Sequence, residues 1–368
     1  MKIGDCEYNI NDTEVLSKFS GKGISGLVNI GNTCYLNTAI QLLSNVRLFT
    51  LYFIGTKDGS KFIFESDVNR SKKEVLFLKE WFKLMKAIWE DNCVIKPISF
   101  KKTIGAFYDS YGGFRQNDCQ EALSKIIDLL HTGVSYKANI KHVILNKSKA
   151  LTERDRIHIE SIEAWKRMFH KEYSIPVSLF YGQFYQRVIC DECNYVSKTF
   201  DPFNVLTLPI DDTCENIYDC FKKLSLSEDL DGDNMITCEK CKVKRSMKKK
   251  VTLWKAPNIL VIAFERFKNI FNKISKRIDF PLQKLRLSSI AENNSDKMAT
   301  YDLIGVGNHF GGIQGGHYTA YCKNQNNIWF EYDDSSVEEV SSPNLVVSNQ
   351  AYILVYERNN IPLKTIIS

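Results

Sequence analysis

The sequence predicts an α+β fold in which helices come first along the chain and strands follow. Three segments of the first half carry apolar residues at helical spacing, whereas the second half holds many short segments rich in β-branched and aromatic residues. Of the 368 residues, 44% are apolar and 12% are aromatic, which is enough for a large buried core. This length is typical of one elaborated domain or of two.

Each of the three predicted helices presents apolar side chains on one face. They cover residues 34–46, 74–89 and 119–130. Asp118 precedes the third helix and Glu121 follows three residues later, a pattern that resembles a capping box. These signals place two helix starts, at Cys34 and Cys119, with some precision.

Strands are predicted only after residue 180. Their expected ranges are 182–189, 204–210, 251–254, 259–267, 301–306, 317–322, 328–332 and 351–356. Residues 132–175 show neither period clearly, and we expect a mixed insertion there.

Net charge and the lack of targeting signals are consistent with an intracellular protein. A formal net charge of +6 is a mild bias that permits an acidic partner without indicating nucleic acid. No stretch approaches the ~20 uninterrupted apolar residues of a membrane span. Residues 1–20 are polar and lack the apolar centre of a secretory signal, so we expect a flexible leader on an intracellular protein of the cytoplasm, the nucleus or both.

Four of the eleven cysteines form two C-x-x-C pairs, Cys190 with Cys193 and Cys238 with Cys241. Two such pairs complete a Cys₄ shell with no open position, the arrangement of structural zinc, and their wide separation suggests two hairpins joined at their tips. Four unrelated thiols are the alternative. A redox role is less well supported, because one pair would suffice for it and no thioredoxin-like βαβ pattern surrounds either pair.

Seven basic residues lie between Lys240 and Lys250, beside the second cysteine pair. A solvated face of a hairpin is the simpler interpretation of this run. Contact with nucleic acid is the alternative, and it would make the chain a zinc-dependent nucleic-acid-binding protein.

Cys34 lies where a loop rich in glycine and asparagine becomes a helix. Free amides and the positive end of the helix dipole lower the pKa of a thiol at such a position, and the same amides can stabilise an oxyanion. Asn29 offers a further amide donor for that oxyanion. Taken alone, Cys34 is equally well interpreted as a buried structural cysteine.

The best candidate for a base beside Cys34 is His317. His309 and His317 bracket a run that contains four glycines, Gly315 and Gly316 among them, and glycines allow close approach of a substrate backbone. His317 opens one predicted strand, and Asp333 and Asp334 end the next. Two adjacent antiparallel strands would bring an aspartate near the histidine, which is the logic of a Cys–His–Asp triad. Ordinary turn chemistry explains the two aspartates equally well when they are taken in isolation.

Several segments together resemble one family, the ubiquitin-specific proteases. They occur in the family's order across roughly residues 24–357, and the first and the last two are the most specific. The segments are Gly26-Leu-Val-Asn-Ile-Gly-Asn-Thr-Cys-Tyr, Gln116-Asn-Asp-Cys-Gln-Glu-Ala-Leu, Tyr181-Gly-Gln-Phe, Phe203-Asn-Val-Leu-Thr-Leu-Pro, Gly315-Gly-His-Tyr-Thr-Ala-Tyr and Trp329-Phe-Glu-Tyr-Asp-Asp.

The resemblance implies a papain-like cysteine protease fold with thumb, palm and zinc-bearing fingers. It divides a catalytic domain at residues 21–360 into a thumb at about 27–135, the insertion at 132–175, fingers at about 181–255 and a palm at about 256–357. One departure is Ala263-Phe-Glu-Arg-Phe267, where the family usually has His-Leu-Lys-Arg-Phe. This leaves the catalytic set intact but puts substrate contacts of that strand in doubt.

The resemblance also implies roles for single residues. Cys34 matches the nucleophile, His317 the general base, Asp333 the orienting acid with Asp334 beside it, and Asn29 the oxyanion donor. Positions that border the tail of ubiquitin are matched by Asp118, Gln116, His309, Gly315 and Gly316.

The implied activity is hydrolysis of the bond after the C-terminal glycine of ubiquitin, with ubiquitin and ubiquitinated proteins as partners and structural zinc as the metal. A catalytically silent ubiquitin-binding scaffold and the same chemistry on a ubiquitin-like modifier are the alternatives within the family.

Overall fold

The computed structural model describes residues 2–3, 6–7, 19–54, 71–138, 151–269, 272–312 and 315–359. Its helices are α2 (Cys34–Ser44), α3 (Arg47–Ile54), α5 (Lys72–Glu90), α6 (Ile98–Gly105), α7 (Asp109–Gly112), α8 (Cys119–Val134), α9 (Glu153–Phe169), α10 (Ile175–Phe180), α11 (Ile217–Leu224) and α12 (Asn294–Met298). The α+β prediction is confirmed, with α2 to α8 preceding all but a few short strands.

Most strands of the described residues lie after residue 181, and four short ones precede it. They are β1 (Lys2–Ile3), β2 (Cys6–Glu7), β3 (Gly26–Leu27), β4 (Val94–Ile95), β5 (Gly182–Cys190), β6 (Val196–Phe203), β7 (Leu206–Leu208), β8 (Glu228–Leu230), β9 (Ile236–Thr237), β10 (Lys244–Arg245), β11 (Met247–Lys255), β12 (Ile259–Phe264), β13 (Phe267–Asn269), β14 (Asn272–Lys273), β15 (Leu285–Arg286), β16 (Thr300–Gly311), β17 (Gly316–Lys323), β18 (Trp329–Asp333), β19 (Ser336–Glu339) and β20 (Ala351–Arg358).

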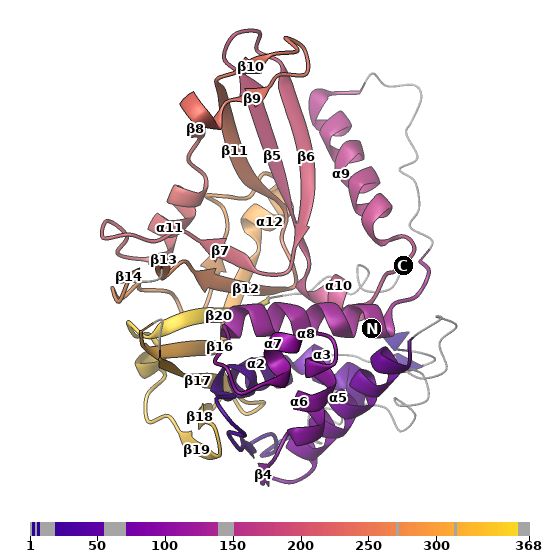
Figure 1. Ribbon diagram of the computed structural model, residues 1–368, viewed down its shortest axis with the longest axis vertical. Helices are drawn as coiled ribbons and strands as arrows, with labels where there is room; N and C mark the ends of the chain where they lie inside the picture. Colours follow the sequence, from indigo (N-terminus) through magenta and orange to yellow (C-terminus); the bar gives the residue numbers. More distant parts are fainter. Residues whose placement is uncertain are drawn as a thin grey trace.

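Three bodies make up the molecule (Figure 1). The helical unit, α2 to α8, lies at the bottom of the view beside the broad sheet, whose strand order is β19-β18-β17-β16-β20-β12-β7 with β15 paired to β16. The narrow sheet, of order β6-β5-β11-β8, projects from the top. Helix α2 packs directly on β17. The helical unit and the broad sheet therefore share one hydrophobic core, which runs from Leu36 to Val355.

Local sequence explains where the predicted helices begin and end. Ser71 caps α5 through a full capping box with Glu74, so this helix starts two residues before the predicted range. Asp118 caps α8 as predicted, since its side chain accepts a hydrogen bond from the Glu121 amide. The reciprocal half of that capping box does not form at this described helix start, and the Glu121 carboxylate instead pairs with Lys125 at 2.6 Å.

Two predicted strands are shorter than expected. The range 204–210 keeps only β7, which pairs with β12 from Leu206 to Leu208, and the Asn204 side chain before it bonds Asp128 and Ser124. The range 259–267 ends as β12 at Phe264. There the chain turns, and the fully buried Arg266 donates to the carbonyl oxygens of Ala351, Ile274 and Lys276.

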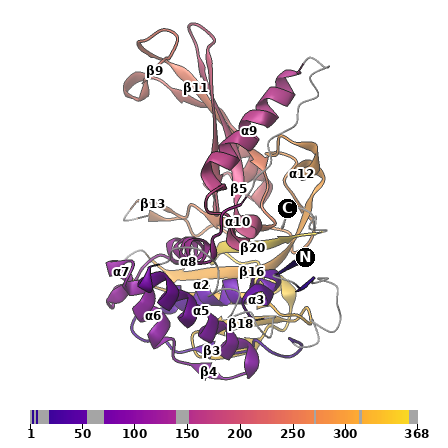
Figure 2. The same ribbon diagram turned by 90° about the vertical axis from the view of Figure 1, so that its right-hand side faces the viewer.

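The insertion at 132–175 contains a long helix, α9, that covers one face of the narrow sheet (Figure 2). Thr152 and Asp155 form its capping box. Aromatic rings of Tyr185 and Phe200 stack on that face, and Glu153 of α9 pairs with Lys198 of β6. The β9 hairpin leans toward the opposite face of the sheet, away from α9 (Figure 2).

Candidate active site and metal centre

Cys34 is the first residue of α2, and its side chain is buried, with 3% exposure. The loop before it is tightly wound, because Gly31 and Asn32 both have positive φ, of 104° and 54°. The Asn29 side-chain oxygen accepts hydrogen bonds from the amides of Gly31 and Thr33 at 3.2 and 3.0 Å. The asparagines and glycine of this segment therefore build the turn that delivers the thiol to the helix start.

Burial raises the pKa of the Cys34 thiol above its ordinary value, and this is the largest influence on it. The backbone amides of Tyr318, Tyr35 and Cys34 lower the pKa, as the sequence predicts for a helix start, whereas the charge of Asp334 raises it. The predicted lowering is thus wrong in its net sign, because the amides do not outweigh loss of water around the sulfur. Tyr318, whose backbone acts on the thiol, is the residue that follows His317 in the sequence.

His317 and Asp333 lie on neighbouring antiparallel strands, β17 and β18. His317 Nε2 and Asp333 Oδ1 are 2.6 Å apart, and both side chains are partly exposed, by 40% and 53%. The structure therefore pairs the imidazole of β17 with a carboxylate of β18, and the thiol at the start of α2 lies against the backbone of Tyr318, the residue after His317. An imidazole held through Nε2 in this way has its other nitrogen, Nδ1, available for a reaction partner.

Asp334 serves a different neighbour from Asp333. Its φ of 51° is left-handed, a conformation that aspartate tolerates better than most residues. The two carboxylate oxygens accept from Asn29 Nδ2 at 2.9 Å and from Asn37 Nδ2 at 2.8 Å. Because backbone amides already occupy the Asn29 oxygen, the Asn29 amide group has one defined orientation.

Asn37 is a member of this site that the sequence reasoning missed. It is buried, with 3% exposure, and its amide also donates to the Leu27 carbonyl at 3.0 Å. Residues three apart share a helix face, so the spacing of Asn37 from Cys34 was the available signal.

Asp118 combines a capping role with contacts to two tyrosines that the sequence reasoning also missed. Its Oδ1 accepts from the Glu121 amide at 3.0 Å, and its Oδ2 accepts from the hydroxyls of Tyr352 at 2.8 Å and Tyr318 at 3.4 Å. Burial, and next the Asp118 charge, raise the pKa of both tyrosines, so both hydroxyls remain donors at neutral pH. The carboxylate is thereby anchored beside β17.

Gln116, Gly315, Gly316 and His309 lie around the start of β17. Gln116 bonds to Gly316 in both directions, at 3.1 and 3.2 Å. His309 is buried at 3% exposure against the rings of Phe267 and Tyr318, while Gly315 is exposed. Burial, followed by the charges of Lys273 and Arg266, lowers the pKa of His309 to about 4, so this histidine is neutral at physiological pH.

Other histidines serve structural contacts. His131 bonds Ser174, His170 bonds the Lys166 carbonyl, and His158 packs on Trp254. His142 lies outside the described residues. His317 is the described histidine that lies next in sequence to a Cys34 contact.

Four cysteines meet at the tip of the narrow sheet. Cys190 ends β5 and Cys193 lies in the turn to β6, while Cys238 and Cys241 lie in the turn between β9 and β10, as predicted for two hairpins. Their sulfur atoms all lie within 4.8 Å of one another, so they can hold a metal ion. A hydrogen bond from the Cys241 amide, the largest of several effects, lowers the pKa of Cys238 to about 7, whereas a hydrogen bond with Cys193, followed by burial, raises the pKa of Cys241 to about 12.

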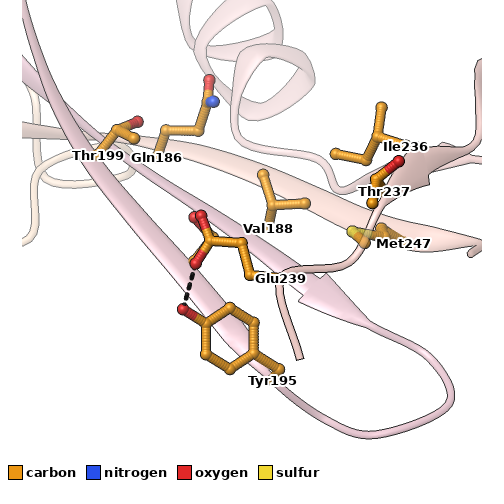
Figure 3. Close-up of a pocket in the computed structure, with 9 residues that line it drawn as sticks. Gln186, Val188, Tyr195, Thr199, Ile236, Thr237, Glu239 and Met247 are labelled. Atoms are coloured by element: carbon orange, nitrogen blue, oxygen red, sulfur yellow. Dashed lines mark hydrogen bonds between the residues drawn. The ribbon is translucent and has the colours of Figure 1, made fainter. Parts of the chain in front are cut away.

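A protein contact also joins the two cysteine turns. Tyr195 Oη donates to Glu239 Oε2 at 2.6 Å, at the rim of a pocket of about 240 Å³ (Figure 3). Val188 of β5 and Met247 of β11 line this pocket on the sheet face opposite α9. The basic run after Cys238 is partly neutralised nearby, because Lys248 and Lys249 pair with Asp229 and Glu228.

A sequence model described as "Ubiquitin carboxyl-terminal hydrolase" matches residues 25–356, which include every part of the site. The chain belongs to the ubiquitin carboxyl-terminal hydrolase family. The resemblance seen in the sequence motifs is thereby confirmed. Among the described residues of this family member, no helix has the length and apolar character needed to cross a membrane.

Curated relatives of this ubiquitin carboxyl-terminal hydrolase family member include three from distant sources. Ubiquitin carboxyl-terminal hydrolase 2 of Bos taurus is 32% identical over 95% of this chain and 57% of its own length. Usp2 of Drosophila melanogaster is 33% identical over 92% of this chain and 35% of its own length. A probable ubiquitin carboxyl-terminal hydrolase of Acanthamoeba polyphaga mimivirus is 29% identical over 92% and 91%. The chain thus spans about half the length, or less, of the first two.

Solved structures give the same fold. The SAGA Ubp8/Sgf11/Sus1/Sgf73 DUB module bound to ubiquitin aldehyde has a TM-score of 0.67 at 23% identity, over 92% of this chain and 70% of that chain. A complex of this module with monoubiquitin has a TM-score of 0.68 at 24% identity, over the same shares. At these identities the likeness establishes the fold, and the expected deubiquitinase architecture is confirmed.

Proposed function

We propose that this protein is a cysteine-type deubiquitinase, which hydrolyses the isopeptide or peptide bond after the C-terminal glycine of ubiquitin. The observation that carries the proposal is the His317–Asp333 pair on strands whose backbone reaches Cys34 at Tyr318, beside an Asn29 amide that Asp334 orients. Family membership supplies the substrate class. Ubiquitinated proteins are then the partners, and an intracellular, reducing compartment suits both the free Cys34 thiol and the cysteine metal centre.

The catalytic cycle follows from this geometry. His317 takes the proton of Cys34, and the sulfur attacks the carbonyl carbon of ubiquitin's last residue. Asn29 and the helix-start amides stabilise the oxyanion, while Asp333 holds the imidazolium. His317 then protonates the departing amine, usually a lysine ε-amine, and water hydrolyses the thioester.

Subdomains and binding residues complete the proposal. We assign the thumb to about 27–135, the insertion to 132–175, the fingers to about 181–255 and the palm to about 256–357, within a catalytic domain at residues 21–360. We assign the channel of the ubiquitin tail to Asp118, Gln116, His309, Gly315 and Gly316.

Zinc is the proposed metal at the tip of the narrow sheet. Four cysteine thiolates within reach of one tetrahedral ion fit zinc and leave no position for a substrate. A bound zinc would join the two turns and supply structural rigidity, with no part in bond cleavage.

Turnover of ubiquitin labelled at its C-terminus tests the function, with labelled ubiquitin-like modifiers alongside. We expect hydrolysis of ubiquitin, its loss in Cys34→Ala, and its retention in Cys93→Ala, which removes an exposed cysteine far from the site in sequence. Ubiquitin binding without turnover by the unaltered protein would favour a silent scaffold. Faster turnover of another modifier would change the substrate.

A further inference from the structure

The first residues of β17 have one backbone edge that no strand occupies. β16 pairs with β17 from Gly316 to Cys322, whereas β18 pairs with it only from Ala320 to Lys323. Among the described strands, none therefore lies against Gly316–Thr319 on the side away from β16. Backbone groups on that side therefore have no strand as a partner and can bind other groups.

Two side chains of the helical unit fill this open edge. The Gln116 amide donates to the Gly316 carbonyl at 3.1 Å and accepts from the Gly316 amide at 3.2 Å. Two residues further on, the backbone of Tyr318 faces the Cys34 thiol closely enough to lower its pKa. Residues two apart present their backbone groups to the same edge, so Gln116 and Cys34 occupy successive positions along it, ~7 Å apart.

Gln116 offers Gly316 what a peptide bond would offer. A primary amide carries one carbonyl and an N–H group, and here both are used at once, as between two paired strands. An extended chain whose last carbonyl lies at Cys34 can continue along this edge only toward Gly316, because β18 occupies the other direction. Such a chain would need the Gly316 groups that Gln116 holds.

Gly316 itself is confined from the opposite side. A Cβ atom built on it would lie 2.2 Å from His309 Nε2 and 2.7 Å from the Phe310 oxygen. Gly316 therefore accepts no side chain, and because β16 pairs with it on the other side, the substrate and Gln116 must compete for the same backbone groups.

We propose that Gln116 is a latch that occupies the tail-binding edge of β17 in the free protein and is displaced when an extended, glycine-ended tail adds to that edge as a short strand. The inference rests on the proposed function and deepens it, because it assigns the residue that sets the cost of tail entry. Release of the latch precedes productive binding, so the apparent affinity for ubiquitin is reduced by the fraction of molecules that are latched.

Ubiquitin affinity measured in the inactive Cys34→Ala background tests the latch. Gln116→Met retains side-chain length but removes both hydrogen bonds. We expect it to tighten ubiquitin binding by about three- to tenfold, the range that two neutral hydrogen bonds offset by side-chain ordering allow. The matched control is Gln283→Met, an exposed glutamine beside β15 near the other end of β16, which should leave the affinity unchanged.

A second readout does not depend on ubiquitin. Hydrogen exchange of the Gly316 amide in the free protein should be faster in Gln116→Met than in the Gln283→Met control. Tighter binding together with faster exchange supports the latch. Equal or weaker binding by Gln116→Met overturns it, and weaker binding would make Gln116 a direct tail contact. Failure of the Cys34→Ala protein itself to bind ubiquitin would instead overturn the proposed function, and the latch with it.

Discussion

The Asp334 carboxylate accepts a hydrogen bond from the Asn29 side chain at 2.9 Å, while the carboxylate next to it in sequence, Asp333, contacts His317 at 2.6 Å. Two consecutive aspartates, whose carboxylates both lie within 4.8 Å of His317, thus hold different side chains of the site. Asp333 orients the base, and Asp334 orients the amide proposed to hold the oxyanion.

Asp334→Asn should lower hydrolysis and accelerate alkylation of Cys34, two effects of opposite sign. Asparagine tolerates the left-handed backbone but cannot accept from both Asn29 and Asn37, so we expect kcat to fall at least ~10-fold. Loss of the Asp334 charge removes an influence that raises the Cys34 pKa, so iodoacetamide should react faster at neutral pH. Glu339→Gln, an exposed carboxylate of β19, is the control. A parallel fall in both rates would point to misfolding instead.

Asp333→Ala should lower the rate of hydrolysis strongly, although a second carboxylate, Asp334, follows in the sequence. Asp334 could substitute only by leaving Asn29 and Asn37, which hold both of its oxygens. We expect kcat to fall by at least ~10-fold with KM little changed, since imidazolium stabilisation acts in the transition state. Steady-state kinetics on labelled ubiquitin measure this, and near-normal kcat would make Asp334 the partner of His317.

Alkylation of Cys34 should keep rising with pH through the ordinary range of a thiol. Burial raises its pKa above the reference value of 9.0, so the thiolate fraction increases with pH and should reach no plateau below about pH 9. The rate of iodoacetamide reaction from pH 6 to 10, in a Cys93→Ala background, measures it. A plateau near neutral pH would indicate a stable thiolate–imidazolium pair in the free protein.

Metal content should follow the four cysteines of the narrow sheet. Elemental analysis of reduced protein should find one zinc per chain, and Cys190→Ser or Cys241→Ser should lose it. Cys93→Ser should retain it, since that residue lies outside the cluster. Loss of zinc should lower the affinity for ubiquitin more than it changes the rate of Cys34 alkylation. Zinc-free wild-type protein with an intact narrow sheet would contradict the assignment.

Asp118→Asn separates capping from charge recognition. Asparagine caps helices nearly as well as aspartate, so we expect the melting temperature to stay within a few degrees. The ubiquitin tail carries two arginines before its terminal glycines, and loss of one charge-assisted hydrogen bond should lower kcat/KM by at least ~10-fold. Unchanged kinetics would leave Asp118 as a cap and an anchor for Tyr318 and Tyr352.

Prediction from sequence worked best where the signal is local. The starts of α2 and α8 follow from a turn and a cap, and β16, β17, β18 and β20 follow from dense β-branched and aromatic runs, whereas the short β19 was not predicted. Helix α9 was missed although Thr152 and Asp155 carry its capping signal, because few of its residues are buried and its apolar period is weak. The lengths of β7 and β12 depend on partners distant in sequence.

The sequence predicts which residues form the site better than it predicts their separate roles and pKa values. Cys34, His317 and Asp333 share recognisable local settings, whereas the division of labour between Asp333 and Asp334 depends on the φ of Asp334. The net pKa of Cys34 depends on how deeply the thiol is buried, which no motif records. Tyr352 reaches Asp118 across 234 residues of sequence, a contact that only the folded chain reveals.

The narrow sheet has a consequence for how the protein is made. β5 and β6 are consecutive strands that can pair once both have left the ribosome, but β5 also pairs with β11 on its other edge. β11 begins 44 residues after β6 ends, so at translation rates of ~5–20 residues per second the edge waits roughly 2–9 s, with two thiols of Cys190 and Cys193 lacking their counterparts. Nascent chains are therefore most vulnerable to mispairing and to capture by chaperones during this interval.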